Sequence, residues 1–296
     1  MSLSKTSPAL RDYVTLAVLS LIWGSSYILI KKGLEVFSPA QVGALRLGIS
    51  ALALAPLALV HLRKITWKQV PLLVVIGITG TGLPSVLFPV AQTQLSSSLT
   101  GMLSGLTPLY TFIIAYLFFA RRGEGTGRQF LGVLLGLAGA VLLAWAAPGA
   151  AGQTTQFAYA GFILLACLCY ATSSNLVGAF FRDLPALTIT VASFFLVGLP
   201  ALIWALSAGA VVQTVQTHPR GWLALGYVVT LAVFSTVLAS IVFFRLVQRN
   251  GAVFASVVSY IIPVVALGWG LLDGEALALL QIPAVALVLV GVSLSR

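Results

Sequence analysis

Residues Trp67–Pro108 read WKQVPLLVVIGITGTGLPSVLFPVAQTQLSSSLTGMLSGLTP, and the chain repeats this pattern without a gap, 155 residues later, as Trp222–Pro263. Eight of the 42 aligned positions are identical. Within each helix the polar and aromatic matches follow at steps of three or four residues, which keeps them on one face. These matches are Thr81/Thr236, Ser85/Ser240, Phe88/Phe243, Ser104/Ser259 and Pro108/Pro263. The pattern predicts two copies of one element lining a shared space, with chance similarity as the alternative.

The composition is typical of an integral membrane protein. Fifty-nine per cent of the residues are hydrophobic and 7% are charged, whereas a soluble domain carries about 25% charged residues. Near-continuous apolar windows fit helices of roughly 20 residues across a bilayer and exclude the alternating pattern of a membrane β-barrel. The net charge of +10 is dispersed between the apolar runs. We therefore expect an all-α protein in the lipid bilayer with no nucleic-acid partner.

Ten transmembrane helices are predicted, and their short connections leave no room for a soluble domain. The spans are Tyr13–Ile30, Ala40–Val60, Val70–Ala91, Ser97–Ala120, Phe130–Ala146, Ala158–Phe181, Ala186–Leu206, Trp222–Phe244, Ala252–Leu272 and Ala276–Leu294.

The basic residues between the spans indicate the orientation. With a cytoplasmic N-terminus, the outer side holds only Lys31, Lys32 and Arg220. The inner side holds Lys5, Arg11, Arg63, Lys64, Lys68, Arg121, Arg122, Arg128, Arg182, Arg245, Arg249 and Arg296. The positive-inside rule then predicts a multi-pass protein of a bacterial-type inner membrane with both termini cytoplasmic. Residues Met1–Asp12 lack a small-residue cleavage site, so no cleaved signal peptide is expected.

The repeat extends beyond the opening segment. Its further matches are Ile22–Ser26 with Cys169–Ser173, Pro39 with Pro185, Gln129 with Gln281, and Gly139 with Gly291. Each copy then holds five helices, and an odd number forces the second copy to cross the membrane in the opposite sense. We expect one membrane domain of two inverted repeats around a central cavity, residues 1–149 and 150–296, joined by the linker Pro148–Gln156.

Several short motifs resemble those of the drug/metabolite transporter superfamily, specifically its ten-helix EamA-type exporters. The motifs are Ile22-Trp23-Gly24-Ser25-Ser26-Tyr27, Ala44-Leu45-Arg46-Leu47, Leu106-Thr107-Pro108, and Gly274-Glu275 followed by Gln281 and Gly291. Within that family the chain looks similar to the YddG-type amino-acid exporters. The resemblance covers essentially the whole chain, and it implies ten helices around a substrate cavity and export of small metabolites, amino acids among them.

Polar and aromatic side chains at mid-membrane depth are the candidates for substrate binding. Membrane interiors penalise polar groups, so a stripe of them favours function, although hydroxyls at such spacings also mediate helix packing. Trp and Tyr normally lie at the membrane interfaces, which makes mid-depth aromatics stronger candidates. The predicted binding residues are Trp23, Tyr27, Thr81, Ser85, Phe88, Ser104, Tyr170, Ser174, Thr236, Ser240, Ser259 and Tyr260.

Four further residues are candidates for gating or electrostatic roles. Pro84, Pro108 and Pro263 lie inside spans, where each removes a helical hydrogen bond. The run from Gly80 to Pro84 is the expected irregular point, and its counterpart lacks the second glycine and the proline. Arg46 is the ionised residue deepest in a span, about 10 Å from the outer end. It could pair with a carboxylate or gate the cavity, or it could hydrogen-bond carbonyls at a helix end.

These features predict a secondary transporter for a small-molecule substrate, most simply an amino-acid exporter. A drug or toxic-cation exporter is the nearest alternative, and the missing buried carboxylate disfavours it. A membrane-embedded enzyme would need catalytic groups at membrane depth, and the spans hold no Asp, Glu or His. No cofactor or metal is expected, and we read Cys167 and Cys169 as small buried side chains. Because no acid lies at mid-membrane, we also expect transport without obligatory ion coupling; the oligomeric state stays open.

Overall fold

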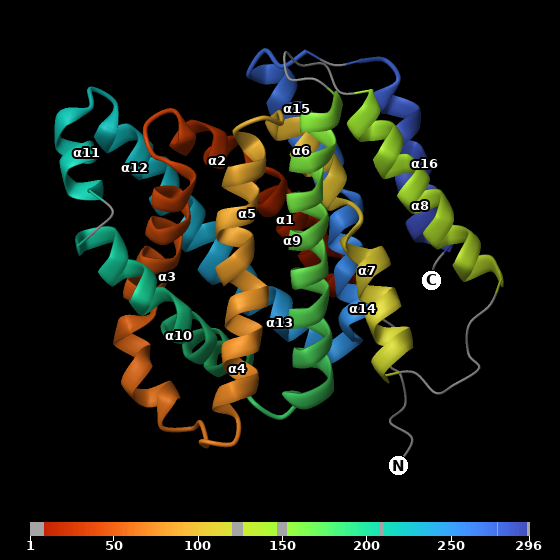
Figure 1. The fold of residues 1–296 in the computed structure, drawn as a ribbon. Helices are drawn as coiled ribbons and strands as arrows, with labels where there is room; N and C mark the ends of the chain where they lie inside the picture. Colours follow the sequence, from red (N-terminus) through yellow and green to blue (C-terminus); the bar gives the residue numbers. More distant parts are fainter. Residues whose placement is uncertain (1–8, 120–126, 147–152, 208–209, 277, 295–296) are drawn as a thin grey trace.

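The computed structural model describes residues 9–119, 127–146, 153–207, 210–276 and 278–294, and within these ranges every regular element is helical (Figure 1). Several sequence-based expectations lie outside the described residues. They concern the N-terminal segment 1–8 with Lys5, the basic residues Arg121, Arg122 and Arg296, and residues 148–152 of the expected linker.

The first half of the chain forms a series of straight and interrupted helices. They are α1 (Leu10–Gly24), α2 (Ser26–Leu34), α3 (Pro39–Leu62), α4 (Val70–Gly77), η1 (Ile78–Gly82), α5 (Leu83–Gln92), α6 (Ser97–Ser104), α7 (Thr107–Ile114), η2 (Ala115–Phe119) and α8 (Gly127–Trp145).

Among the described residues, the second half follows a similar order, with an additional short helix, α11, with an unbroken α9 in place of α1 and α2, and with no counterpart of η2 after α15. Its elements are α9 (Gln153–Phe180), α10 (Ala186–Ser207), α11 (Val211–Thr217), α12 (Gly221–Thr230), η3 (Leu231–Leu238), α13 (Ala239–Asn250), α14 (Ala252–Ala255), η4 (Ser256–Tyr260), α15 (Ile262–Leu272) and α16 (Gln281–Leu294).

Among the described residues, eight continuous helical rods are long and apolar enough to cross a membrane. They are Leu10–Leu34, Pro39–Leu62, Val70–Gln92, Ser97–Phe118, Thr154–Phe180, Ala186–Ser207, Gly221–Asn250 and Ala252–Leu272. Two shorter apolar helices, Leu131–Trp145 and Gln281–Gly291, coincide with the fifth and tenth predicted spans. The multi-pass helical class is therefore established, and the count of ten spans stays a prediction.

Several span boundaries differ from the sequence-based expectation. The first rod ends at Leu34 rather than Ile30, and α9 begins at Gln153 rather than Ala158, so residues 153–156 of the expected linker are helical. The eighth predicted span continues to Asn250 rather than ending at Phe244, because the chain first leaves the helix at Gly251, whose φ is +86°. Such a backbone conformation costs glycine little. The last helix begins at Gln281 rather than Ala276, where the Gln281 side-chain oxygen accepts a hydrogen bond from the Ala278 amide at 3.1 Å.

The long rods are interrupted near their middles. Pro84, Pro108 and Pro263 each lie in the first turn of the helix that follows an interruption, where a missing N–H costs least. The expected irregular point from Gly80 to Pro84 overlaps the π-helical turn η1, which spans Ile78–Gly82. Its counterpart also contains a π-helix, η3, without the second glycine or the proline. Both halves are therefore irregular at this point, and in the second half the Thr236 hydroxyl donates to the Leu231 carbonyl, five residues earlier, at 3.0 Å.

Counterpart helices of the two halves pack directly on one another. α3 packs along α10, α6 along α15, and α8 along α16, the last pair at one edge of the bundle (Figure 1). A methyl group on Gly291 would meet the backbone of Gly136, and one on Gly139 would lie 2.8 Å from the Val288 amide. Gly136 and Gly139 of α8 thus pack closely against α16 within the chain, as small residues permit in membranes.

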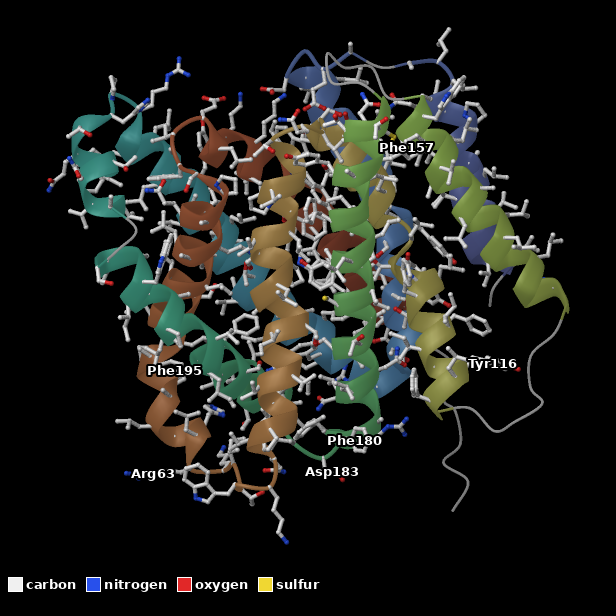
Figure 2. All side chains as sticks on the ribbon, in the orientation of Figure 1. Arg63, Tyr116, Phe157, Phe180, Asp183 and Phe195 are labelled. Carbon is white, nitrogen blue, oxygen red and sulfur yellow. The ribbon has the colours of Figure 1, made fainter. Side chains whose placement is uncertain are left out.

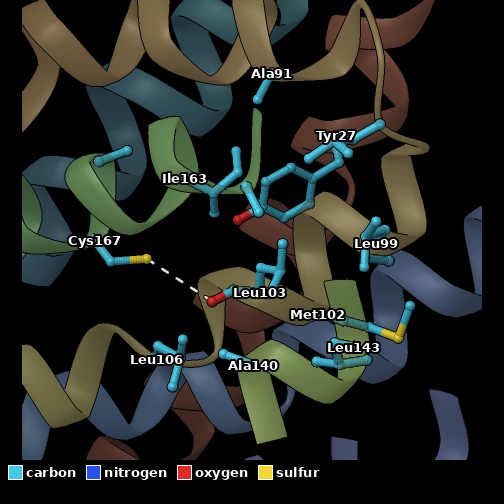
Figure 3. Close-up of a cluster of buried hydrophobic side chains, with 14 of the residues drawn as sticks. Tyr27, Ala91, Leu99, Met102, Leu103, Leu106, Ala140, Leu143, Ile163 and Cys167 are labelled. Atoms are coloured by element: carbon cyan, nitrogen blue, oxygen red, sulfur yellow. Dashed lines mark hydrogen bonds between the residues drawn. The ribbon is translucent and has the colours of Figure 1, made fainter. Parts of the chain in front are cut away.

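The largest buried apolar cluster joins α2, α5, α6, α8 and α9 around Leu103 and Ile163 (Figure 3). Cys167 belongs to it, is fully buried, and directs its thiol toward the carbonyls of Leu103 and Ser104 at 3.9 and 3.8 Å. The break after α6 frees carbonyls here, and the cysteine supplies a weak donor to them. Cys169 is also buried, and neither cysteine is in a disulfide.

A charged network centred on Glu275 closes one end of the bundle. One carboxylate oxygen accepts from the amide of Ser97 at 3.0 Å, from its hydroxyl at 2.7 Å, and from Lys31 Nζ at 2.8 Å. The other accepts from the Ser98 amide at 3.0 Å and from its hydroxyl. Lys31 also pairs with Asp273 at 2.7 Å. This end lies opposite Arg63 and Asp183 (Figure 2), and the network ties the C-terminus of α2 to the N-terminus of α6 and the loop after α15.

The pKa of Glu275 reflects these contacts. Burial alone would raise it, but the hydrogen bonds from Lys31, Ser98 and Ser97 outweigh burial and lower the pKa from 4.5 to about 2. The negative charge also lies at a helix N-terminus, where it is favoured. A carboxylate with a depressed folded-state pKa contributes stability above its unfolded pKa and loses it as the pH falls toward the folded value.

We predict that Glu275→Gln lowers the melting temperature of the detergent-purified protein at pH 7 by several degrees, because Lys31 loses a partly buried partner. The wild-type advantage over this variant should disappear between pH 4.5 and about 2. Glu35→Gln is the matched control, since Glu35 forms exposed ion pairs with Lys32 at 3.0 Å and Arg220 at 3.2 Å that are worth little. Equal melting of both variants at pH 7 would contradict the assigned role of Glu275.

Candidate substrate cavity

A cavity opens where the interrupted helices meet, with walls from both halves of the chain. The first half contributes residues of α1, α2, α3, η1, α5, α6 and α7, and the second half contributes residues of α9, η3, α13, η4 and α15. The lining residues are Trp23, Ser26, Tyr27, Ile30, Arg46, Gly80, Thr81, Phe88, Ser104, Thr107, Thr111, Tyr170, Ser173, Ser174, Ser235, Thr236, Ser240, Phe243, Phe244, Ser256, Val258, Ser259 and Ile262.

Ten of the twelve predicted binding residues lie in this wall, together with Arg46. They are Trp23, Tyr27, Thr81, Phe88, Ser104, Tyr170, Ser174, Thr236, Ser240 and Ser259. The structure thus brings together residues that are up to 236 positions apart in the sequence, from Trp23 to Ser259. Their binding role stays a prediction.

Ser85 and Tyr260 lie outside the cavity wall, and local helix geometry explains why. The η1 turn is wider than an α-helix, so the register of α5 is shifted. Ser85 therefore lies against α3: a methyl group added to Gly43 of α3 would be 2.8 Å from the Ser85 carbonyl oxygen. Around Tyr260 the chain is a 3₁₀-helix, which repeats every three residues. Ser256, Ser259 and Ile262 therefore share the cavity face, while Tyr260 packs against the apolar cluster.

Pro84, Pro108 and Pro263 do not line the cavity either. They act on it through the backbone, because each begins a helical segment that follows an interruption. At Pro108 the freed carbonyl, that of Ser104, is taken by a side chain of the chain itself, because Thr107 Oγ1 donates to it at 2.8 Å.

Two aromatic pairs face the cavity from equivalent positions of the two halves. Phe88 stacks on Tyr170 with ring centroids 5.9 Å apart, and Phe243 meets Trp23 edge to face at 5.0 Å. Phe88 corresponds to Phe243, and Tyr170 to Trp23, in the internal repeat. Tyr27 extends the first pair, 5.6 Å from Phe88. Such pairs are stabilising beyond their apolar burial, and they give the cavity two apolar surfaces.

The indole of Trp23 has a defined partner. Its Nε1 donates to the Ser235 carbonyl at 2.8 Å. Ser235 lies in η3, so this hydrogen bond ties the break of the first rod to the π-helix of the eighth. The ring face of Trp23 remains part of the cavity wall.

Arg46 turns inward and is buried, with 6% of its surface exposed. Its Nε donates to Thr236 Oγ1 at 2.7 Å, and the Thr236 hydroxyl in turn donates to the Leu231 carbonyl. Its guanidinium also lies near the Tyr170 hydroxyl. The hydrogen-bond partners of this side chain are therefore hydroxyls of the other half rather than carbonyls at a helix end.

The remaining polar groups of the wall are hydroxyls. Its residues include no Asp, Glu or His, so the described wall can donate and accept hydrogen bonds but holds no group that binds a proton or a hard cation through a carboxylate. Within the part of the chain that the structure describes, no group of three potential metal ligands occurs. The chemistry available here is recognition of a small molecule by aromatic faces, hydroxyls and one guanidinium.

Several wall residues escaped the sequence analysis although a signal was present. Phe243 is the repeat counterpart of Phe88 and was recognised as a match without being chosen as a binding residue. Thr107 and Thr111 continue the stripe of Ser104 at steps of three and four residues. Ser26 and Ser173 are repeat counterparts of one another, and each lies three residues after a predicted aromatic, Trp23 and Tyr170 respectively, on the same helix face.

Comparison with known proteins agrees with the fold and the repeat. The model of the EamA-like transporter family matches residues 11–145 and 158–296. An uncharacterized transporter of Archaeoglobus fulgidus is 22% identical over 96% of this chain and 98% of its own length. The uncharacterized inner membrane transporter YedA of Escherichia coli is 24% identical over 94% of this chain and 88% of its own.

A solved crystal structure shares the fold, with a TM-score of 0.65 over 98% of this chain and 97% of that one at 19% identity. The family match covers both halves of the chain, and the two relatives are transporters aligned over nearly their whole lengths. The chain therefore belongs to the EamA-like transporter family and is a membrane transporter of small substrates.

Proposed function

We propose that the protein exports small metabolites, amino acids among them, by alternating access around the cavity between its two halves. The observation that carries the proposal is that both halves of the chain contribute residues to the cavity wall. Equivalent aromatic pairs and equivalent interrupted helices of the two halves meet at one place, which is the arrangement that inverted-repeat transporters use for a substrate site near the bilayer midplane.

Ten spans in two inverted five-helix halves, residues 1–149 and 150–296, form the framework of this proposal. The pattern of helix contacts supports it, because contacts recur when each helix is exchanged for its counterpart. α5 packs on α9 as α13 packs on α1, α4 packs on α10 as α12 packs on α3, and α7 packs on α9 as α15 packs on α1. The two segments matched by the family model support the same division. We place both termini in the cytoplasm of a bacterial-type inner membrane.

Transport proceeds without obligatory coupling to protons or sodium. The cavity wall offers no carboxylate or imidazole, and carriers driven by such ions usually keep one at membrane depth. The acids Asp273 and Glu275 are engaged with Lys31 at one end of the bundle. The same absence disfavours a cation exporter, since a cationic drug would find the Arg46 guanidinium and no counter-charge.

The aromatic pairs generate the first test. Phe88→Ala should raise the KM for transport in proteoliposomes about 5- to 150-fold, because a buried aromatic anchor is worth about 1 to 3 kcal/mol. The control is Phe234→Ala, since Phe234 is 54% exposed and lies outside the cavity wall. An unchanged KM in correctly folded Phe88→Ala protein would return this ring to a packing role.

The second test concerns topology. In a variant without Cys167 and Cys169, single cysteines at Ser38 and Thr217 should react with a membrane-impermeant maleimide added to intact cells. Cysteines at Lys64 and Asp183 should react only after the membrane is opened. All four positions are exposed at helix ends or loops of the structure. Labelling of all four in intact cells, or the reverse pattern, would contradict the inverted repeat.

The third test concerns energy coupling. In proteoliposomes, an imposed pH or sodium gradient should not concentrate a neutral zwitterionic amino acid above equilibrium, whereas an outward gradient of the same amino acid should drive exchange. The physical reason is the lack of an ion-binding carboxylate in the cavity wall. Accumulation that collapses when an ionophore is added would refute uncoupled transport.

A further inference from the structure

Arg46 is a buried cation with no carboxylate partner in the described residues. None of the ion pairs in the described chain includes it. An arginine stays charged at physiological pH, and a charge taken out of water without a counter-charge costs several kcal/mol. The Nε bond to Thr236 satisfies one donor and supplies no negative charge. A charged group of this kind is retained at membrane depth when it serves function.

A second observation points to the same place. Thr81 lines the cavity and is 2% exposed. Its hydroxyl has no hydrogen-bond partner within the described structure, although buried polar groups nearly always have one. Thr81 and Thr236 are repeat counterparts. One threonine therefore contacts the guanidinium, while the equivalent hydroxyl is left to bond whatever occupies the cavity.

From these two observations we infer that Arg46 is the anchor for a carboxylate of the substrate, with Thr81 as an additional hydroxyl contact. The inference rests on the proposed function and specifies its ligand chemistry. A guanidinium presents its donors as a planar fork that fits a carboxylate in two parallel hydrogen bonds. Because the cavity wall carries one guanidinium and no other cation, it matches one carboxylate in charge, whereas a phosphate dianion would exceed it.

The rest of the wall defines the remainder of such a ligand. Phe88, Tyr27 and Tyr170 offer aromatic surface beside the guanidinium, which suits an apolar side chain. The wall lacks a carboxylate to hold an ammonium group. The geometry therefore makes the carboxylate the required group and the amine a secondary one.

The test pairs binding with stability. Proteoliposomes with wild-type protein are given each of the 20 common amino acids and the corresponding α-amides, in which an uncharged amide replaces the carboxylate. For each compound we measure how strongly it competes with the transport of a labelled amino acid that the wild type carries. Among compounds that compete, the acid should act at least tenfold more strongly than its amide. The difference should vanish in Arg46→Met and be partly kept in Arg46→Lys. Arg220→Met is the control, because Arg220 is exposed at the bundle end.

Melting without ligand separates binding from a merely structural role. Arg46→Met removes an uncompensated buried charge, so it should melt at the same temperature as the wild type or higher. A clear loss of stability, or equal competition by acids and amides, would overturn the inference and leave the transporter proposal intact. If the wild type transports none of the compounds, both proposals are contradicted.

Discussion

Inside a bilayer, every backbone carbonyl released by an interrupted helix must find a donor within the protein. This constraint organises the molecule around its cavity. The Thr236 hydroxyl takes the Leu231 carbonyl, and Thr107 takes that of Ser104. In the eighth rod, the same Thr236 hydroxyl oxygen also accepts a hydrogen bond from Arg46 Nε. The same bonds that make the irregular backbone tolerable therefore position polar groups at the centre of the membrane.

The duplication turns these local solutions into a cavity. A single five-helix copy would expose its polar stripe to lipid, whereas two copies pack counterpart helices together and face their stripes inward. The pairs Phe88 with Tyr170 and Phe243 with Trp23 repeat one contact on both sides of the space. The charge does not follow this symmetry, because Arg46 corresponds to Ala192 in the other half. That difference gives an otherwise duplicated cavity a single cationic point.

The sequence was sufficient to predict the membrane class, the helical rods and about half of the wall, because apolar length and repeated hydroxyl spacing report directly on burial. It was insufficient wherever the helix departs from 3.6 residues per turn. Ser85 and Tyr260 fit an α-helical stripe, but the π-turn η1 and the 3₁₀-helix η4 direct them elsewhere. The sequence of the π-helix η3 also contains no glycine or proline that would indicate an irregular helix. The Glu275 network was missed because its partners come from three distant loops and helix ends.

The central claim is that this cavity opens to each side of the membrane in turn. The most direct measurement labels a single cysteine at Ser240, a partly exposed wall residue, in a variant without Cys167 and Cys169. An impermeant reagent is applied to right-side-out and inside-out vesicles. The account predicts labelling from both sides, slowed in each case by a transported substrate. Labelling from one side only, at a rate that no transported substrate changes, would contradict it.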